Sequence, residues 1–112
     1  MLNKRLNPVR GVLSEEYDVV LRKIGVYKKA LSSLPIGSLV MKKINSGAYY
    51  YLAKRIKKRV VFEYIGKMSP EELARWDGIK SKKAQYRRFL SDLREQEAFL
   101  KRVLHERKKH SS

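Results

Sequence analysis

The sequence "GAYYYLAKRIKKRVVFEYIGK", Gly47 to Lys67, decides which fold this chain can adopt. It is rich in β-branched and aromatic residues, which favour strands, and a cluster of Lys and Arg residues interrupts it. The Asn45-Ser46-Gly47 sequence at its start is typical of a hairpin turn. We therefore predict a meander of three antiparallel strands, which cover Leu39–Ile44, Ala48–Ile56 and Arg59–Ile65.

The two strand connections differ in their turn residues. Asn45-Ser46-Gly47 suits a three-residue loop with its glycine in the left-handed region. Lys57-Lys58 offers neither Gly nor Asn, so we expect a loop of about four residues, Ile56–Arg59, instead of a two-residue turn.

Alternation along the strands, combined with these turns, divides the sheet into two faces. The more apolar face is assigned to the core, and it carries Leu39, Met41, Tyr49, Tyr51, Ala53, Val60, Phe62 and Tyr64. The other face mixes cations with apolar groups and is assigned to solvent; it carries Lys42, Tyr50, Leu52, Lys54, Arg59, Val61 and Glu63. A shift of one residue in register would exchange the faces.

Helical patterns flank the predicted sheet. Ser14 is a candidate N-cap, and Pro35 ends the helix that follows. One apolar stripe runs along that helix, through Tyr17, Val20, Ile24, Tyr27, Leu31 and Leu34.

The second helix begins with a capping box, in which Ser69 precedes Pro70 and Glu72. We expect an interruption near Asp77-Gly78. A second stripe then follows, through Tyr86, Phe89, Leu93, Leu100 and Val103.

Together these elements predict an α+β fold. An N-terminal helix leads into the three-stranded antiparallel meander, and a long C-terminal helix packs antiparallel on the first helix. We expect a flexible basic arm over residues 1–13, a single domain over 14–108 and a disordered tail over 109–112. Dimerisation through the helical stripes is the competing way to bury them.

Charge points to a polyanionic partner. The chain of 112 residues has 27 Lys and Arg against 11 Asp and Glu, a net charge of +16. Ile36–Met68 alone holds eight basic residues and one acidic residue. The chain has no Cys and no apolar segment of membrane-spanning length, so we expect a cytoplasmic protein without membrane contact.

Two segments, "LPIGSLVMKKINSGAYYYLAKRI" and "EYIGK", resemble a family of small prokaryotic proteins without an established activity. Members share a Leu-Pro-x-Gly-Ser entry, a Tyr-Tyr-Tyr-Leu strand and a Tyr-Ile-Gly-Lys exit, and a similar hairpin begins some transposases. The resemblance implies a mobile-element or defence context. The chain departs from the pattern at Lys57, where Gly is usual, and at Val61 and Glu63, where polar or basic residues are usual.

The leading hypothesis is a small, basic, non-enzymatic protein that binds DNA or RNA. Cations would contact phosphates and Tyr50 would stack on a base. The expected site comprises Lys42, Tyr50, Lys54, Arg55, Lys57, Lys58, Arg59, Lys80, Lys82, Lys83, Arg87 and Arg88. The alternative is a protein-interaction module, such as an accessory subunit, antitoxin or inhibitor, that docks on an acidic protein or nuclease complex.

Catalysis has little support in the sequence. The two histidines, His105 and His110, lie in the basic C-terminal segment without partners at metal-ligand spacing. There is no Gly-rich phosphate loop. We expect no catalytic residue, metal site or cofactor.

Overall fold

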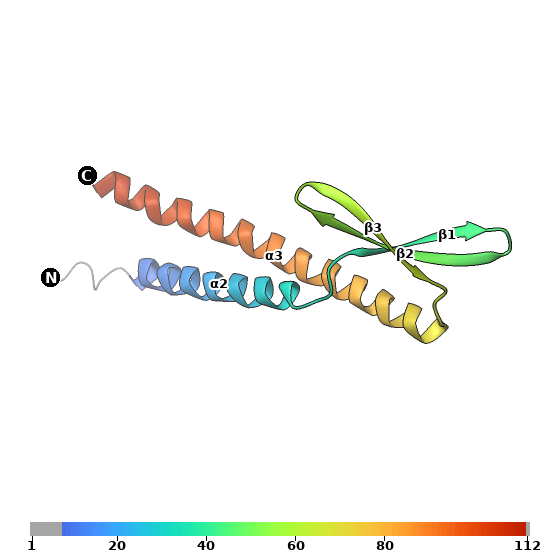
Figure 1. The fold of residues 1–112 in the computed structure, drawn as a ribbon. Helices are drawn as coiled ribbons and strands as arrows, with labels where there is room; N and C mark the ends of the chain where they lie inside the picture. The colour runs from blue at the N-terminus through green and yellow to red at the C-terminus, as the bar shows by residue number, and fades with distance from the viewer. Residues whose placement is uncertain (1–7, 112) are drawn as a thin grey trace. The chain divides into compact units, whose positions relative to one another are not determined.

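The computed structural model describes residues 8–111, with side chains as far as His105. It contains α2 (Pro8–Ser32), β1 (Ser38–Ile44), β2 (Gly47–Ile56), β3 (Arg59–Gly66) and α3 (Pro70–Ser111), and Figure 1 shows this order along the chain. The predicted α+β fold is confirmed. The chain divides into two compact units: a helical unit, residues 1–31 with 86–112, and a sheet unit, residues 32–85. The predicted single domain over residues 14–108 stays a prediction.

Helix α2 begins at Pro8, six residues before the predicted start at Ser14. Proline is favoured in a first helical turn because its missing N–H has no partner there in any case. Leu13 also continues the apolar stripe by one turn and packs against the core. Of the predicted flexible arm, residues 8–13 are therefore helical, and residues 1–7 lie outside the described chain.

The helical unit is built on the two predicted stripes. Val20, Leu93 and Leu100 are buried together, with Tyr17 and Ile24 packed around them. At one end of this core, the Tyr27 ring lies 5.8 Å from the Tyr86 ring and 5.0 Å from the Phe89 ring, measured between centroids. Residues that come later in α2 thus contact residues that come earlier in α3, which confirms the antiparallel helix pair.

Helix α3 starts at the predicted capping box. The Ser69 N–H donates to Glu72 Oε1 at 3.0 Å, and the Glu72 N–H donates to Ser69 Oγ at 3.2 Å. The backbone hydrogen bond from Ser69, followed by the side-chain bond, lowers the pKa of the Glu72 carboxyl below its ordinary value. Two of the orphan N–H groups at the helix start are therefore satisfied.

The predicted interruption at Asp77-Gly78 is wrong, because α3 runs unbroken from Pro70 to Ser111. A glycine in a helix costs only about 1 kcal/mol relative to alanine, and half-buried Trp76 and Ile79 on either side hold the helix in place. Residues 109–111 of the predicted tail are helical, while Ser112 lies outside the described residues. Neither described helix is long and apolar enough to cross a membrane.

The sheet has the order β1-β2-β3, and its strands match the predicted ranges to within one residue at each end. Both turns are shorter than predicted. Ile44 pairs with Gly47, which leaves a two-residue turn in which Asn45, at φ 58°, takes the left-handed conformation. Ile56 pairs with Arg59, so the second turn is also two residues long.

The shorter first turn changes the sheet faces. Met41 pairs with Tyr50 and Leu39 pairs with Leu52, so these β1 side chains share a face with Tyr50. Lys42 pairs with Tyr49 instead. The predicted grouping of β1 with β2 is therefore wrong by one residue, as expected when a predicted loop is one residue too long.

The assignment of inside and outside is also wrong. Leu52, expected in solvent, is 8% exposed, whereas Phe62 and Tyr64, expected in the core, are each 60% exposed. Gly37, at φ 106°, explains the burial, because a Cβ placed on it would come within 3.0 Å of the Leu52 side chain. The backbone that enters β1 therefore covers Leu52, and the Lys83 ammonium on α3 donates to the Gly37 carbonyl at 3.0 Å.

Candidate nucleic-acid interface

The uncovered side of the sheet, here called the open face, combines aromatic rings with cations. Its residues, set by the strand register, are Ser38, Val40, Lys42, Ile44, Gly47, Tyr49, Tyr51, Ala53, Arg55, Val60, Phe62 and Tyr64. The opposite side, which carries Leu39, Tyr50 and Leu52, is called the covered face. The open face thus holds four aromatic residues and two cations.

The rings of the open face are ordered by one another and by lysines. Tyr51 and Tyr64 pair across β2 and β3 with their ring centroids 5.2 Å apart and their planes 60° apart. The Lys42 ammonium lies 5.8 Å from the centroid of Tyr51. Such an arrangement presents ring surface and positive charge at the same place, which suits a flat, negatively charged ligand.

A second lysine extends the same face beyond the strands. Lys67 follows β3, and its ammonium lies 5.8 Å from the ring centroid of Tyr49. The Tyr49 ring also lies close over Gly47, where a Cβ would come within 3.0 Å of the ring. A Cβ at position 47 would therefore force the Tyr49 ring to shift.

The tip of the second hairpin is strained. Lys57 and Lys58 have φ values of 50° and 68°, so both occupy the left-handed region. Two-residue hairpin turns of this form favour Asn and Gly, because other residues lose about 1–2 kcal/mol in that conformation. Both lysines are exposed. Residues in such sparsely populated conformations are often found at functional sites.

Three predicted site residues lie on the covered face instead. Tyr50 is half-buried there beside Leu52, and Arg59 is exposed near the hairpin tip. The Lys54 ammonium forms an ion pair with Glu63 at 2.8 Å. Tyr50 is thus in a poor position to stack on a base, and Lys54 already has an anionic neighbour.

The predicted helical cluster is divided between the two units. Lys80 and Lys82 are exposed in the sheet unit, where the half-buried Lys83 is bonded to Gly37. Arg87 and Arg88 are exposed in the helical unit. Lys83 therefore has a role in the fold, while Lys80 and Lys82 stay candidates for phosphate contact.

Sequence reasoning missed five residues of this surface: Tyr49, Tyr51, Phe62, Tyr64 and Lys67. Counting apolar residues placed the four aromatic ones in the core. The signal that could have corrected this is "INSG", which allows a two-residue turn at Asn45-Ser46 as well as the longer loop. Within the described residues, no group of three His, Asp or Glu side chains could hold a metal ion, and His105 is exposed.

The match to a protein family covers the sheet and both of its flanks. The family model described as "Domain of unknown function (DUF6788)" matches residues 16–75, from the first helix through the start of α3. No curated protein and no solved structure matches the chain. Since the matched segment is more than half of the 112 residues, the chain belongs to the DUF6788 family.

Proposed function

We propose that this protein binds single-stranded nucleic acid on the open face of its sheet. The observation that carries the proposal is the exposed aromatic surface of Phe62 and Tyr64 beside the Tyr51–Lys42 stack. Exposed large aromatic side chains gathered on one face commonly mark a binding surface. A base can stack on each ring, with a gain of about 1–3 kcal/mol per stacked base.

The single strand is favoured over the duplex by the shape of the surface. Bases in a duplex are stacked on one another, so their faces cannot reach an aromatic side chain. Phe62 and Tyr64 are two residues apart on one strand, about 7 Å, which leaves room for a separate base on each ring. Such stacking is sequence-tolerant, so we expect little discrimination among bases.

Phosphate contacts come from the cations around the rings. Lys42 and Arg55 lie on the open face, and Lys57 and Lys58 project from the hairpin tip that joins β2 to β3. Lys67 extends the positive surface next to Tyr49. These five residues replace the predicted set that included Tyr50, Lys54 and Arg59. Lys80 and Lys82 add exposed charge in the first half of α3.

Docking on an acidic protein is the second candidate, because the same cations would attract any polyanion. The exposed rings of Phe62 and Tyr64 favour nucleic acid, since flat unpaired bases match them and carboxylates do not. The mobile-element or defence context implied by the sequence resemblance fits a nucleic-acid ligand and stays part of the proposal.

The experiment is a titration of fluorescein-labelled oligothymidine, oligouridine and a DNA duplex with protein that has been freed of nucleic acid by nuclease and high-salt treatment. We expect the single strands to bind more tightly than the duplex. The logarithm of the affinity should fall linearly with the logarithm of salt concentration, by about 0.7 per phosphate contact. Affinity that does not respond to salt, or preference for the duplex, would contradict the proposal.

Charge reversal locates the site. The variant Lys57→Glu/Lys58→Glu should lower both the affinity and the salt slope, because it removes two phosphate contacts. The matched control is Lys28→Glu/Lys101→Glu, which reverses two exposed lysines of the helical unit. Equal losses in the two variants would show that net charge, and not the sheet, governs binding. An acidic protein that competes better than oligothymidine would favour the second candidate.

A further inference from the structure

One side of the helical unit carries apolar side chains that its core does not use. Val12, Val19 and Val26 recur every seven residues along α2; Val12 and Val26 are 61% and 63% exposed. On α3, Phe99 is 54% exposed. We call this surface, together with Phe89 on α3 near Val26, the valine face. A repeat of seven residues is the spacing at which a helix presents one seam to a packing partner.

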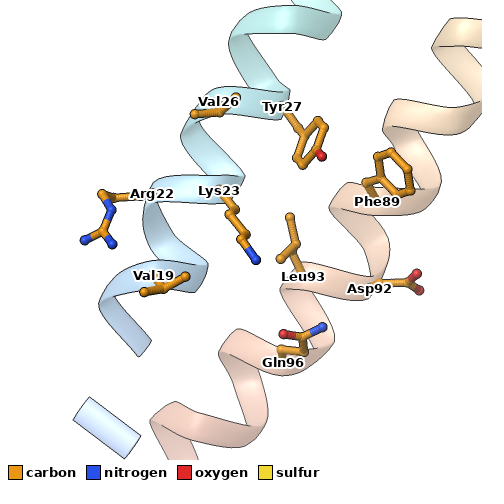
Figure 2. A pocket seen from close by; sticks show the side chains of 9 residues that line it. All are labelled: Val19, Arg22, Lys23, Val26, Tyr27, Phe89, Asp92, Leu93 and Gln96. Atoms are coloured by element: carbon orange, nitrogen blue, oxygen red, sulfur yellow. The ribbon is translucent and has the colours of Figure 1, made fainter. Parts of the chain in front are cut away.

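A groove runs along the valine face between α2 and α3. It has a volume of about 590 Å³, and Val19, Val26, Phe89 and Leu93 contribute its apolar walls. Figure 2 shows Leu93 and Phe89 on one side of the groove and Val19 and Val26 on α2 opposite. A second groove continues past Phe99 and Leu100. The valine face is therefore an extended surface and not an isolated exposed side chain.

The charges beside the groove are arranged by helix. Arg22 and Lys23 lie on α2, and Asp92 lies on α3. Figure 2 shows Arg22 on the outer edge of α2, Asp92 on the outer edge of α3 and Lys23 between the helices. The adjoining groove is bordered by Glu95 of α3 and by Glu16 of α2. None of these five forms an ion pair with another of the described side chains. Beside the first groove, the α2 edge of the valine face is thus basic and the α3 edge acidic.

We propose that two copies of this chain associate through their valine faces to form a four-helix bundle. A twofold axis parallel to the helices, in the plane of the interface, places α2 of one copy on α3 of the other. It leaves the level of each residue along the axis unchanged, so Arg22 and Lys23 face Asp92 of the second copy. Around the first groove the charge pattern is self-complementary, as a symmetric dimer interface requires.

The charges also oppose a twofold axis that runs perpendicular to the helices at the level of Arg22 and Lys23. Such an axis would set α2 against α2 and bring Arg22 and Lys23 near their own counterparts. Like charges in an interface oppose binding. The charges beside the first groove therefore favour the parallel axis.

The helical unit gains a second packed layer from this association. Its own buried cluster consists of Val20, Leu93 and Leu100. Helices form stable domains when their apolar faces are covered, and two antiparallel pairs give the four-helix bundle. A second copy supplies an apolar surface that matches the valine face by identity. The association involves only the helical unit, so it does not depend on nucleic-acid binding by the sheet.

Analytical ultracentrifugation of the nucleic-acid-free protein tests the dimer at about physiological salt, where surface pairs are only partly screened. The wild type should sediment as a dimer. Asp92→Lys and Arg22→Glu should each raise the dissociation constant about tenfold, because the symmetry repeats each like-charge contact twice. Asp18→Lys, an exposed acid outside both grooves, is the matched control and should leave the dimer intact.

The decisive experiment uses an equimolar mixture of the Asp92→Lys and Arg22→Glu variants. Each basic edge in the mixed dimer meets an acidic edge, so the mixture should reassociate with affinity near that of the wild type. A repaired contact within one chain cannot produce this result. Val26→Asn should also weaken the dimer without any change of charge. A wild type that stays monomeric at about 100 µM, well above the micromolar range of weak dimers, overturns the proposal, as does a mixture that stays monomeric.

Discussion

The two faces of the small sheet carry similar residue types and differ in how far their side chains are buried. The covered face buries Leu52 against the backbone at Gly37 and keeps Tyr50 half-buried. The open face leaves Phe62 and Tyr64 exposed and orders Tyr51 with Lys42. Aromatic content alone therefore does not identify the core of a sheet this small. The burial of a face depends on what packs against it, and here the loop before β1 packs only against the face that carries Leu52.

The largest effect is expected on the free energy of unfolding, from a substitution on the covered face. Leu52→Ala should lower the free energy of unfolding by about 2–3 kcal/mol, since Leu52 is the buried side chain of the sheet among the described residues. Chemical denaturation followed by circular dichroism measures the loss. Phe62→Ala on the open face is the control and should change stability by less than about 1 kcal/mol. Equal losses would mean that both faces are part of the core.

Aromatic substitutions on the open face should have the next largest effect, on binding. Phe62→Ala and Tyr64→Ala should each weaken oligothymidine binding by about 1–3 kcal/mol through lost stacking. The salt slope should stay unchanged because no charge is removed. Fluorescence anisotropy at several salt concentrations gives both quantities. Tyr50→Ala, which removes a ring from the covered face, is the matched control, and an equal loss of affinity there would contradict binding on the open face.

The hairpin tip should show a conflict between stability and binding. Lys57→Asn/Lys58→Gly places preferred residues in the left-handed turn and should stabilise the protein by about 1 kcal/mol or more. The same variant loses two cations, so its salt slope for single strands should fall by about 1.4. Thermal unfolding and the salt titration provide the two readouts. A variant that is stabilised but binds with the wild-type slope would leave the strained lysines without a role in binding.

The smallest effect concerns pH and the start of α3. The hydrogen bonds from Ser69 lower the pKa of Glu72, so its carboxylate is favoured in the folded state. A lowered pKa contributes stability that is present above the ordinary value of about 4.3 and is lost as the pH falls through the lower folded value. NMR titration of the Glu72 carboxyl carbon measures it. Ser69→Ala removes the side-chain bond and keeps the backbone bond, so it should return that pKa part of the way toward the ordinary value. No change would show that the Ser69 hydroxyl has no part in the cap.

The helical unit was the more predictable part of the chain. An apolar stripe of period 3.6 is buried once another apolar surface covers it. The stripes through Val20 and Leu93 cover one another as expected. The capping box at Ser69 is a local pattern, so sequence alone was sufficient. The early start of α2 was missed because Gly11 and Pro8 resemble loop punctuation, although Leu13 already belongs to the stripe.

The site was less predictable because it depends on turn length and coverage. One residue of difference at Asn45-Ser46 moves all of β1 relative to β2. The burial of Leu52 depends on Gly37, which lies fifteen positions away in sequence. Neither the turn length nor the coverage of Leu52 can be predicted from the alternation of residues along the strands. Composition was sufficient to identify the cations. The strand register was needed to place the aromatic rings beside them.

Photocrosslinking can show directly which rings of the protein stack on a single strand. An oligothymidine in which 5-iodouracil replaces some thymines reacts, on irradiation, with aromatic side chains that stack on it, and mass spectrometry of the peptides locates the adducts. The account predicts adducts on Tyr51, Phe62 or Tyr64, with none on the half-buried Tyr27, Tyr86 and Phe89 of the helical unit. Adducts confined to the helical unit, or on Tyr50 alone, would contradict it.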